Sequence, residues 1–280
     1  MDDGSAKQLA KGFNRRNHTI TAEWFSSMLR VCYISMLCED GTREHAVTAA
    51  SAEGVDDGCW LAARLAESGQ NPGSIDLTRL SIALGDKLPC LADEATGAPL
   101  FDMIVLGGTF FGVHDGRPWQ QPLRAWLLAQ RASGTPLLGI CGGHQAMAVA
   151  AGGRVTRRPG GTAAGSLPVT TTAAGAVHPL LAGIAQPAFH FGNGDEVSTV
   201  PPEATVLATT DDSPAVALDY GGGWLSTQFH PEASHTMFQH WVDAGIIGAP
   251  APEIAYRELG TGRALIANFL AWAASQSTAS

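Results

Sequence analysis

The stretch PLLGICGGHQAMAVAAGG, residues 136–153, decides the fold of this chain. Its first residues form a short, continuously apolar run, which is typical of a strand buried on both faces of a parallel sheet. The run leads through Gly139-Ile140-Cys141-Gly142-Gly143 directly into a helical pattern. The sequence therefore predicts a strand–turn–helix unit with a cysteine on the turn, the context of a nucleophile elbow.

Similar units surround this stretch. Strand patterns occupy residues 29–37, 74–82, 101–108 and 135–140, and helix patterns occupy residues 60–69, 122–133, the segment after Gly142, and 262–274. We expect the first of these helices to end at Gly69. Alternating strands and helices predict an α/β fold with a doubly wound, mostly parallel sheet flanked by helices.

The second half of the chain has a different pattern. Short β-like runs at residues 154–170, 187–197, 204–210, 215–220 and 224–230 are separated by Gly, Pro and Asn-Gly turns. Such runs predict additional antiparallel strands at an edge of the sheet and in small ribbons.

The chain shows no convincing linker. We expect an N-terminal extension over residues 1–28 and one domain over residues 29–280.

Composition excludes several classes of function. The 280 residues are 45% hydrophobic and 15% charged, which is typical of a globular protein with a substantial core. The formal net charge of −9 argues against a nucleic-acid partner, because phosphate binding relies on clustered Lys and Arg. No apolar run reaches the length of about 18 residues that a membrane span needs. The polar start of the chain has no secretory pattern, so the expected location is the cytoplasm.

Five cysteines are scattered along the chain without a CxxC pair or a metal-finger spacing. His230, His235 and His240 recur every five residues, which does not place them on one face of a helix. The sequence therefore predicts reduced thiols, no metal site and no cofactor.

Cys141 stands apart from the other cysteines. At a helix N-terminus, the helix dipole and the free N–H groups favour a thiolate. The N–H groups of Gly142 and of the loop Gly107-Gly108 could stabilise an oxyanion beside it. A buried structural cysteine on a glycine-rich turn would give the same local pattern, so a catalytic interpretation needs a base.

WLSTQFHPE, residues 224–232, supplies a candidate base at the end of a predicted strand. A cysteine nucleophile needs an imidazole to exchange protons with, and the imidazole needs a carboxylate to orient it. In an extended backbone, residues two apart point to the same side, so Glu232 can reach His230. A surface turn with unrelated His and Glu residues is the alternative for this motif alone.

Taken together, GICGGHQ and TQFHPE resemble the two signatures of the class I (triad) glutamine amidotransferase family. This family includes the glutaminase parts of GMP synthetase, anthranilate synthase and carbamoyl phosphate synthetase. The segment MIVLGGTFFGVHDGRPW, residues 103–119, resembles the oxyanion-loop strand of the family. The resemblance covers residues 100–235 well and residues 29–100 only through the strand–helix pattern. It implies a flavodoxin-like sheet.

The resemblance also implies roles for individual residues. Cys141 would be the nucleophile, His230 the base and Glu232 the orienting acid. Gly108 and Gly142 would form the oxyanion hole.

Substrate contacts are implied less directly. Gln145 matches a family position that holds the substrate glutamine. Asn193 stands where relatives often carry His, whereas Gly194-Asp195 agree with the family. Two interpretations of this segment are therefore open: Asn193 and Asp195 contact the substrate, or the segment is an Asn-Gly turn.

The implied chemistry is hydrolysis of the glutamine side-chain amide through a thioester intermediate. In the family, the ammonia passes to a synthetase, and the chain contains no phosphate-binding G-x-x-x-x-G-K-[ST] loop of its own. The expected substrate is glutamine or a γ-glutamyl compound, and an ATP-dependent synthetase subunit is the expected partner. The alternatives are a free-standing γ-glutamyl peptide hydrolase or transferase, and a non-catalytic binding subunit.

Overall fold

The computed structural model of the chain describes residues 28–67 and 74–277. The expected N-terminal extension, residues 1–28, lies outside the described residues except for Met28. The expected helix end at Gly69 also lies outside them.

One eight-stranded sheet forms the centre of the molecule, in the order β2-β1-β3-β4-β12-β11-β10-β7. The pairings from β2 to β12 are parallel, and those from β12 to β7 are antiparallel. The order of the parallel strands is that of flavodoxin-like folds, as the sequence predicts. The strands are β1 (Leu29–Ser35), β2 (Ile75–Ser81), β3 (Met103–Leu106), β4 (Leu137–Ile140), β7 (Thr170–Thr171), β10 (Thr205–Thr210), β11 (Ser213–Gly221) and β12 (Trp224–Thr227).

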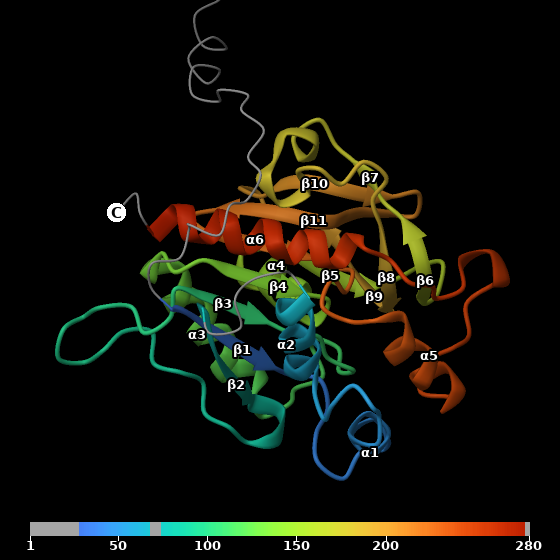
Figure 1. The fold of residues 1–280 in the computed structure, drawn as a ribbon, viewed down its shortest axis with the longest axis horizontal. Coiled ribbons are helices and arrows are strands. Elements are labelled where there is room, and N and C mark those ends of the chain that lie inside the picture. Colours follow the sequence, from blue (N-terminus) through green and yellow to red (C-terminus); the bar gives the residue numbers. More distant parts are fainter. Residues whose placement is uncertain (1–27, 68–73, 278–280) are drawn as a thin grey trace, which may run out of the picture.

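Helices cover both faces of this sheet. α2 (Asp57–Glu67) contacts α6 (Thr261–Ser277), which runs across the sheet on the side nearer the viewer in Figure 1. α3 (Gln120–Ser133) contacts α4 (Gly142–Ala150), and buried residues of both helices belong to one hydrophobic cluster. No helix of residues 28–67 and 74–277 is long and apolar enough to cross a bilayer.

The side chains of β1 show why its sequence is almost continuously apolar. Val31 and Tyr33 belong to one buried cluster, which includes residues of α2 and α6. Cys32 and Ile34 belong to a second cluster, which includes residues of α3 and α4. Successive side chains of a strand point to opposite faces, so a strand covered on both faces has apolar residues at every position.

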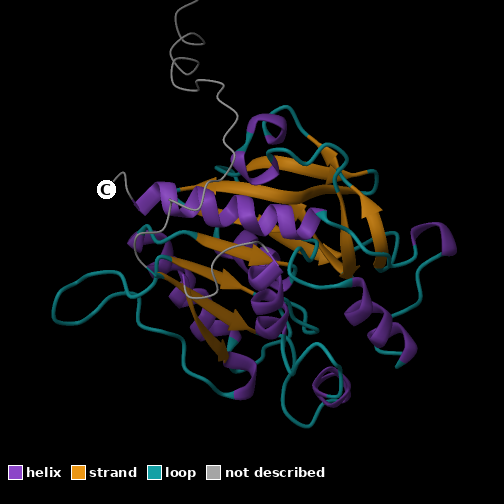
Figure 2. Ribbon diagram, in the orientation of Figure 1, coloured by secondary structure: helices purple, strands orange, loops and turns teal. Residues whose placement is uncertain are grey.

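Two antiparallel ribbons complete the fold beside the sheet, as Figure 2 shows in orange. One joins β5 (Arg154–Arg157) to β9 (Asp195–Thr199), and the other joins β6 (Ala163–Pro168) to β8 (Ala188–Asn193). The ribbons confirm the prediction of added antiparallel strands.

Two helices were not predicted from the sequence. α1 (Arg43–Ala49) is short, and Thr42 caps it by accepting a hydrogen bond from the His45 N–H. α5 (His235–Asp243) is capped in the same way by Ser234. Its buried residues, Met237, Phe238 and Trp241, follow helical spacing, which is the signal that could have revealed it.

Candidate active site

Cys141 occupies the sharp turn between β4 and α4. Its backbone angles are φ 51° and ψ −101°, and among the described residues no other non-glycine residue has a positive φ. Its N–H donates to the Thr227 carbonyl oxygen of β12 at 2.8 Å. A side chain in this sparsely populated region costs free energy and persists only where the surrounding structure enforces it. The turn therefore has the strained geometry that the sequence predicts for a nucleophile elbow.

Close packing explains two glycines of the motif. A Cβ added at Gly143 would lie 2.3 Å from the Leu106 carbonyl oxygen, and one at Gly139 would lie 2.4 Å from Met147 Sδ. Because real Cβ atoms do not approach neighbours this closely, larger residues would force β3, β4 and α4 apart.

His230 and Glu232 follow the C-terminal end of β12. The His230 Nδ1 and Glu232 Oε1 atoms are 2.7 Å apart, and the two side chains are 5% and 0% exposed. The His230 N–H donates to the His190 carbonyl oxygen at 2.9 Å, which fixes the backbone next to β8. The sequence-predicted contact between the ring and the carboxylate is therefore present.

The ring of His230 interacts with Cys141 as well as with Glu232. The pKa of His230 lies well above its usual value. Burial lowers this pKa, but the negative charges of Glu232 and Cys141 and the hydrogen bonds with both residues together raise it by more. A Cβ added at Gly108 would lie 3.0 Å from His230 Cε1 and 3.7 Å from Cys141 Cβ. Gly108 therefore borders both side chains and leaves room for the ring.

A cleft of about 290 Å³ opens beside Cys141. All three residues predicted to contact substrate, Gln145, Asn193 and Asp195, line it together with Cys141. The other lining residues are Thr109, Phe110, Phe111, Gly112, Arg157, Thr162, Gly192, Gly194, Ile246, Ile247 and Gly248. Phe110, Ile246 and Ile247 were not predicted from the sequence, because they come from loops whose position depends on the packing of α5.

Hydrogen bonds connect the predicted substrate residues to one another. Gln145 Nε2 donates to the Asp195 carbonyl oxygen at 3.0 Å and to Gln228 Oε1 at 3.2 Å. Asn193 Nδ2 donates to the same carbonyl oxygen at 2.9 Å. Asn193 thus closes a turn onto Asp195, as its alternative interpretation predicts, and it also faces the cleft.

Gly108 and Gly142 border the turn of Cys141, but their N–H groups differ. The Gly108 N–H donates to Asp57 Oδ2 at 3.2 Å, whereas Gly142 is the first residue of α4, where N–H groups have no partner within the helix. A role for Gly108 in an oxyanion hole stays a prediction, because its donor is directed to Asp57 here.

Asp57 is a buried carboxylate that the sequence did not single out. It begins α2, is 0% exposed and lies against the Gly107-Gly108 backbone. Burial raises its pKa to about 7; the hydroxyls of Ser35 and Tyr33 lower it, and the charge of Glu232 raises it. An acidic residue at the start of a helix is an ordinary capping signal, so the sequence gives no sign that Asp57 contacts the Gly107-Gly108 loop.

Asp57→Asn is expected to change how stability depends on pH. Since the folded-state pKa of Asp57 is raised, its contribution to the free energy of unfolding is fully present below about pH 4 and is lost as pH rises through about 7. Asparagine keeps an acceptor for the Gly108 N–H without the charge. The stability gained by the variant should therefore be larger at pH 8 than at pH 5, by roughly 2 kcal/mol.

Urea unfolding at the two pH values measures this difference. Asp76→Asn, on an exposed position of β2, is the matched control, and its effect should be similar at both pH values. An Asp57→Asn effect that does not change with pH would contradict the raised pKa.

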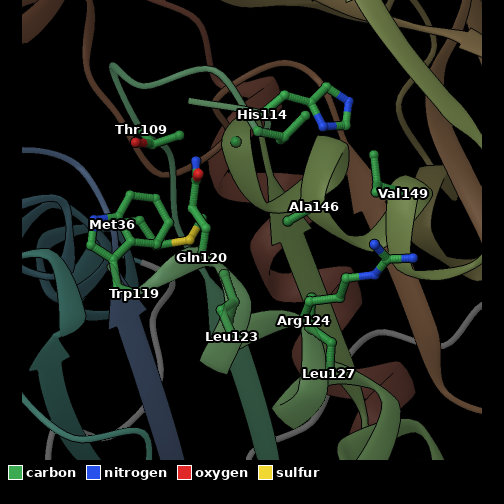
Figure 3. A pocket seen from close by; sticks show the side chains of 12 residues that line it. Met36, Thr109, His114, Trp119, Gln120, Leu123, Arg124, Leu127, Ala146 and Val149 are labelled. Carbon is green, nitrogen blue, oxygen red and sulfur yellow. The ribbon is translucent and has the colours of Figure 1, made fainter. Parts of the chain in front are cut away.

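A second, smaller cavity of about 80 Å³ lies between α3 and α4. Figure 3 shows Leu123 and Leu127 of α3 facing it together with Ala146 and Val149 of α4. Trp119 also borders this cavity. Thr109 lines both this cavity and the cleft.

His144 and Arg158 make buried contacts within the fold. His144 Nδ1 lies 2.7 Å from Ser226 Oγ, and burial lowers the pKa of this histidine to about 3. From the sequence, Arg157 and Arg158 are expected to lie on a solvated hairpin. Arg158 is instead buried: its side chain is 3% exposed and forms ion pairs with Glu196 and Asp212. Across residues 28–67 and 74–277, no group of three or more His, Cys, Asp and Glu residues is placed to hold a metal ion.

A known protein family matches more than half of this chain. The family model described as glutamine amidotransferase class-I matches residues 98–248, which include Cys141, His230 and Glu232.

The relatives of this chain include proteins named GMP synthase [glutamine-hydrolyzing]. The protein from Xanthomonas axonopodis pv. citri (strain 306) is 38% identical over 109 residues, which are 38% of this chain and 21% of that protein. The protein from Burkholderia mallei (strain SAVP1) is 33% identical over 147 residues, 48% of this chain and 25% of that protein. The chain therefore matches about a fifth to a quarter of the length of these relatives.

Solved structures share the fold at lower identity. A glutamine amidotransferase from Thermotoga maritima superposes with a TM-score of 0.65 at 19% identity, covering 88% of this chain and 98% of that one. A glutamine amidotransferase from Methylobacillus flagellatus superposes with a TM-score of 0.58 at 18% identity, covering 90% and 93%. With the family model matching more than half of its residues, the chain belongs to the class I glutamine amidotransferase family.

Proposed function

We propose that this chain is a glutaminase that uses Cys141, His230 and Glu232 to release ammonia from glutamine. The observation that carries the proposal is the buried His230–Glu232 pair, whose Nδ1 and Oε1 atoms are 2.7 Å apart. The charges of Glu232 and Cys141 raise the pKa of the His230 imidazole, although burial lowers it. Cys141, whose backbone has a positive φ at the start of α4, lines the cleft next to this pair. A sulfur, an imidazole and an orienting carboxylate are the parts that nucleophilic amide hydrolysis needs.

In the first half of the reaction, the Cys141 thiolate attacks the carbonyl carbon of the substrate's side-chain amide. The C–S bond forms while the C=O electrons move to the oxygen. When the oxyanion collapses, the C–N bond breaks and the His230 imidazolium gives its proton to the leaving nitrogen. Ammonia departs and a γ-glutamyl thioester remains.

In the second half, water attacks the thioester carbon and His230 accepts a proton from it. The C–S bond then breaks, which releases glutamate and restores the Cys141 thiolate. Glu232 holds the ring through Nδ1 throughout, so that Nε2 faces the reacting atoms.

The oxyanion is stabilised by backbone N–H groups in this proposal. Gly142 offers the free N–H at the start of α4, where the helix dipole favours negative charge. Gly108 is the second donor, and its use requires the bond to Asp57 Oδ2 to be exchanged for one to the oxyanion.

Gln145, Asn193 and Asp195 are the proposed substrate-binding residues. Their support is that all three line the cleft with Cys141 and share hydrogen bonds around one carbonyl oxygen. Gln145 lies one helical turn after Cys141, so it can hold the substrate close to the sulfur.

We also propose that the ammonia is delivered to an ATP-dependent synthetase on a separate chain in the cytoplasm. The relatives named GMP synthase [glutamine-hydrolyzing] motivate this proposal, because their name joins a synthase to glutamine hydrolysis. Within this proposal, residues 29–280 form the amidotransferase domain and residues 1–28 are an extension.

A second candidate function is hydrolysis or transfer of γ-glutamyl groups from larger amides. The observation that favours it is the apolar wall of Phe110, Ile246 and Ile247 along the cleft, which a leaving group larger than ammonia could contact. The two candidates share the triad and differ in the group that leaves.

The proposed chemistry is tested by labelling the protein with a diazo-ketone analogue of glutamine and mapping the modified peptide by mass spectrometry. We expect one adduct, on Cys141, with glutamine protecting against it. Labelling does not require a synthetase, so it reports on the site even when turnover is slow. Turnover of glutamine compared with that of a γ-glutamyl dipeptide then separates the two candidate functions.

A further inference from the structure

The cavity between α3 and α4 has an apolar interior large enough for a small alkyl group. Its volume is about 80 Å³, and Leu123 and Leu127 of α3 line it. Figure 3 shows Trp119 and Met36 on one side of the cavity and Val149 of α4 on the other. An apolar cavity of about 150 Å³ holds benzene, so this smaller one accommodates a group about the size of a leucine side chain.

The charged side chains at this cavity are basic. Arg124 and His114 line it, and both are exposed. No Asp or Glu of residues 28–67 and 74–277 lines it, although the chain has 26 Asp and Glu residues against 17 Lys and Arg. Within this part of the chain, Arg124 forms no ion pair. A free guanidinium beside an apolar cavity favours a ligand that joins a carboxylate to an apolar group.

Hydrogen bonds hold the walls of the cavity in place. Trp119 Nε1 donates to Glu39 Oε1 at 3.1 Å, and Arg117 Nη1 donates to Glu39 Oε2 at 3.1 Å. Gln120 Nε2 donates to the Gly112 carbonyl oxygen at 2.7 Å. Because these side chains are already ordered within the protein, a ligand does not have to order them, and less free energy is lost on binding.

The cavity shares a wall with the cleft beside Cys141. Thr109 lines both, and Gly142 lines the cavity. A Cβ added at Gly142 would be 2.4 Å from Thr109 Cγ2, so the threonine methyl group lies directly against the first residue of α4. Thr109 follows Gly108, whose N–H donates to Asp57. We therefore expect that turning the Gly108 N–H toward an oxyanion shifts Thr109 and changes the shape of the cavity.

We propose that the cavity between α3 and α4 binds a small carboxylate with a branched apolar chain, and that this ligand slows the glutaminase reaction. The apolar chain packs between Leu123, Leu127 and Val149. Arg124 binds the carboxylate, and His114 supplies a second donor from the exposed side.

The direction of the effect follows from the conformation that the ligand fits. The cavity is formed while the Gly108 N–H is bonded to Asp57, and a ligand shifts a protein toward the conformation that it binds better. The bound carboxylate therefore opposes the exchange that the oxyanion needs. The binding site does not depend on the triad, whereas the effect on the reaction rests on the proposed function.

Calorimetry with 4-methylpentanoate tests the site, and 4-methylpentanamide is the uncharged probe of the same shape. The unmodified protein should bind the carboxylate at millimolar concentration and at least tenfold more tightly than the amide, because a charged hydrogen bond is added. Arg124→Gln should abolish this preference. Val149→Phe, which fills the cavity, should weaken binding of the carboxylate at least tenfold. Arg154→Gln, at an exposed arginine of β5 that does not line the cavity, is the matched control and should leave binding unchanged.

The rate at which the diazo-ketone analogue labels Cys141 tests the effect on the reaction. Saturating 4-methylpentanoate should lower the maximal labelling rate roughly fivefold or more. A lower rate at saturating analogue separates this effect from competition in the cleft. Without the carboxylate, Arg124→Gln should be labelled at the unmodified rate, because Arg124 does not line the cleft. With the carboxylate at the same concentration, this variant should lose most of the inhibition.

The outcomes separate the site from its effect. Absence of binding at millimolar concentration, or a preference for the carboxylate that survives Arg124→Gln, would overturn the site. Binding that leaves the maximal labelling rate unchanged would overturn the inhibition. If the unmodified protein is not labelled even without the carboxylate, the proposed function fails, whereas binding that depends on Arg124 still supports the site.

Discussion

Cys141→Ala is expected to lower glutamine turnover by about 10⁴-fold or more and to abolish labelling by the diazo-ketone analogue. Alanine removes the sulfur that forms the thioester, and no other described cysteine lines the cleft. The fold should tolerate the change, because the smaller side chain occupies the same strained turn. Ammonia release and the mass of the labelled protein are the measurements.

The control for this experiment is another cysteine. Cys90 is exposed and free, so Cys90→Ala should retain both turnover and labelling at Cys141. Labelling that persists in Cys141→Ala would reject Cys141 as the nucleophile. Circular dichroism and the unfolding midpoint of the variant show whether a loss of activity reflects the site or the fold.

Glu232→Gln is expected to lower turnover by about 10²–10⁴-fold, chiefly through kcat. The amide can still accept from the ring, but the negative charge beside His230 disappears. Burial lowers the pKa of His230, and Glu232 and Cys141 raise it, so losing one of the two charges should lower it. The imidazolium that protonates the leaving nitrogen then forms less readily.

The pH dependence of the labelling rate and of kcat/KM tests this explanation. The limb that reports protonation of the imidazole should move to lower pH in Glu232→Gln. Glu253→Gln, an exposed glutamate in the segment before α6, is the control and should match the unmodified protein. A variant with normal turnover and an unshifted profile would show that Glu232 does not orient the base.

Both predictions concern residues that the sequence places by local pattern. The apolar run into glycines at 139–143 predicts the turn, and the spacing of His230 and Glu232 predicts that one extended segment brings them together. The structure confirms this proximity at 2.7 Å. These features depend on a few consecutive residues, so the sequence is sufficient to predict them.

The proximity of the Cys141 turn to the His230–Glu232 segment cannot be predicted from local sequence. The sequence does not show that β12 lies next to β4, yet Thr227 pairs with Ile140, and this pairing brings His230 to Cys141. The resemblance to a known family supplied this expectation. The parallel pairing itself arises from packing of the whole sheet between its helices.

Arg157 and Arg158 illustrate a different limit. Adjacent in sequence and identical in type, both fit a solvated hairpin. In the structure, Arg158 is buried in an ion-pair cluster, whereas Arg157 faces the cleft. Successive side chains near a strand end point to opposite sides, and only the surrounding elements decide which side is buried.

The sequence by itself determined the α/β alternation, the cysteine turn and the His-x-Glu segment, because each depends on the periodicity or sterics of neighbouring residues. Tertiary structure alone decided which charges meet in the cleft and which acceptor the Gly108 N–H reaches. That acceptor, Asp57, is 51 residues away and arrives with the N-terminus of α2. The physical reason is that burial and hydrogen-bond partners depend on how distant elements pack.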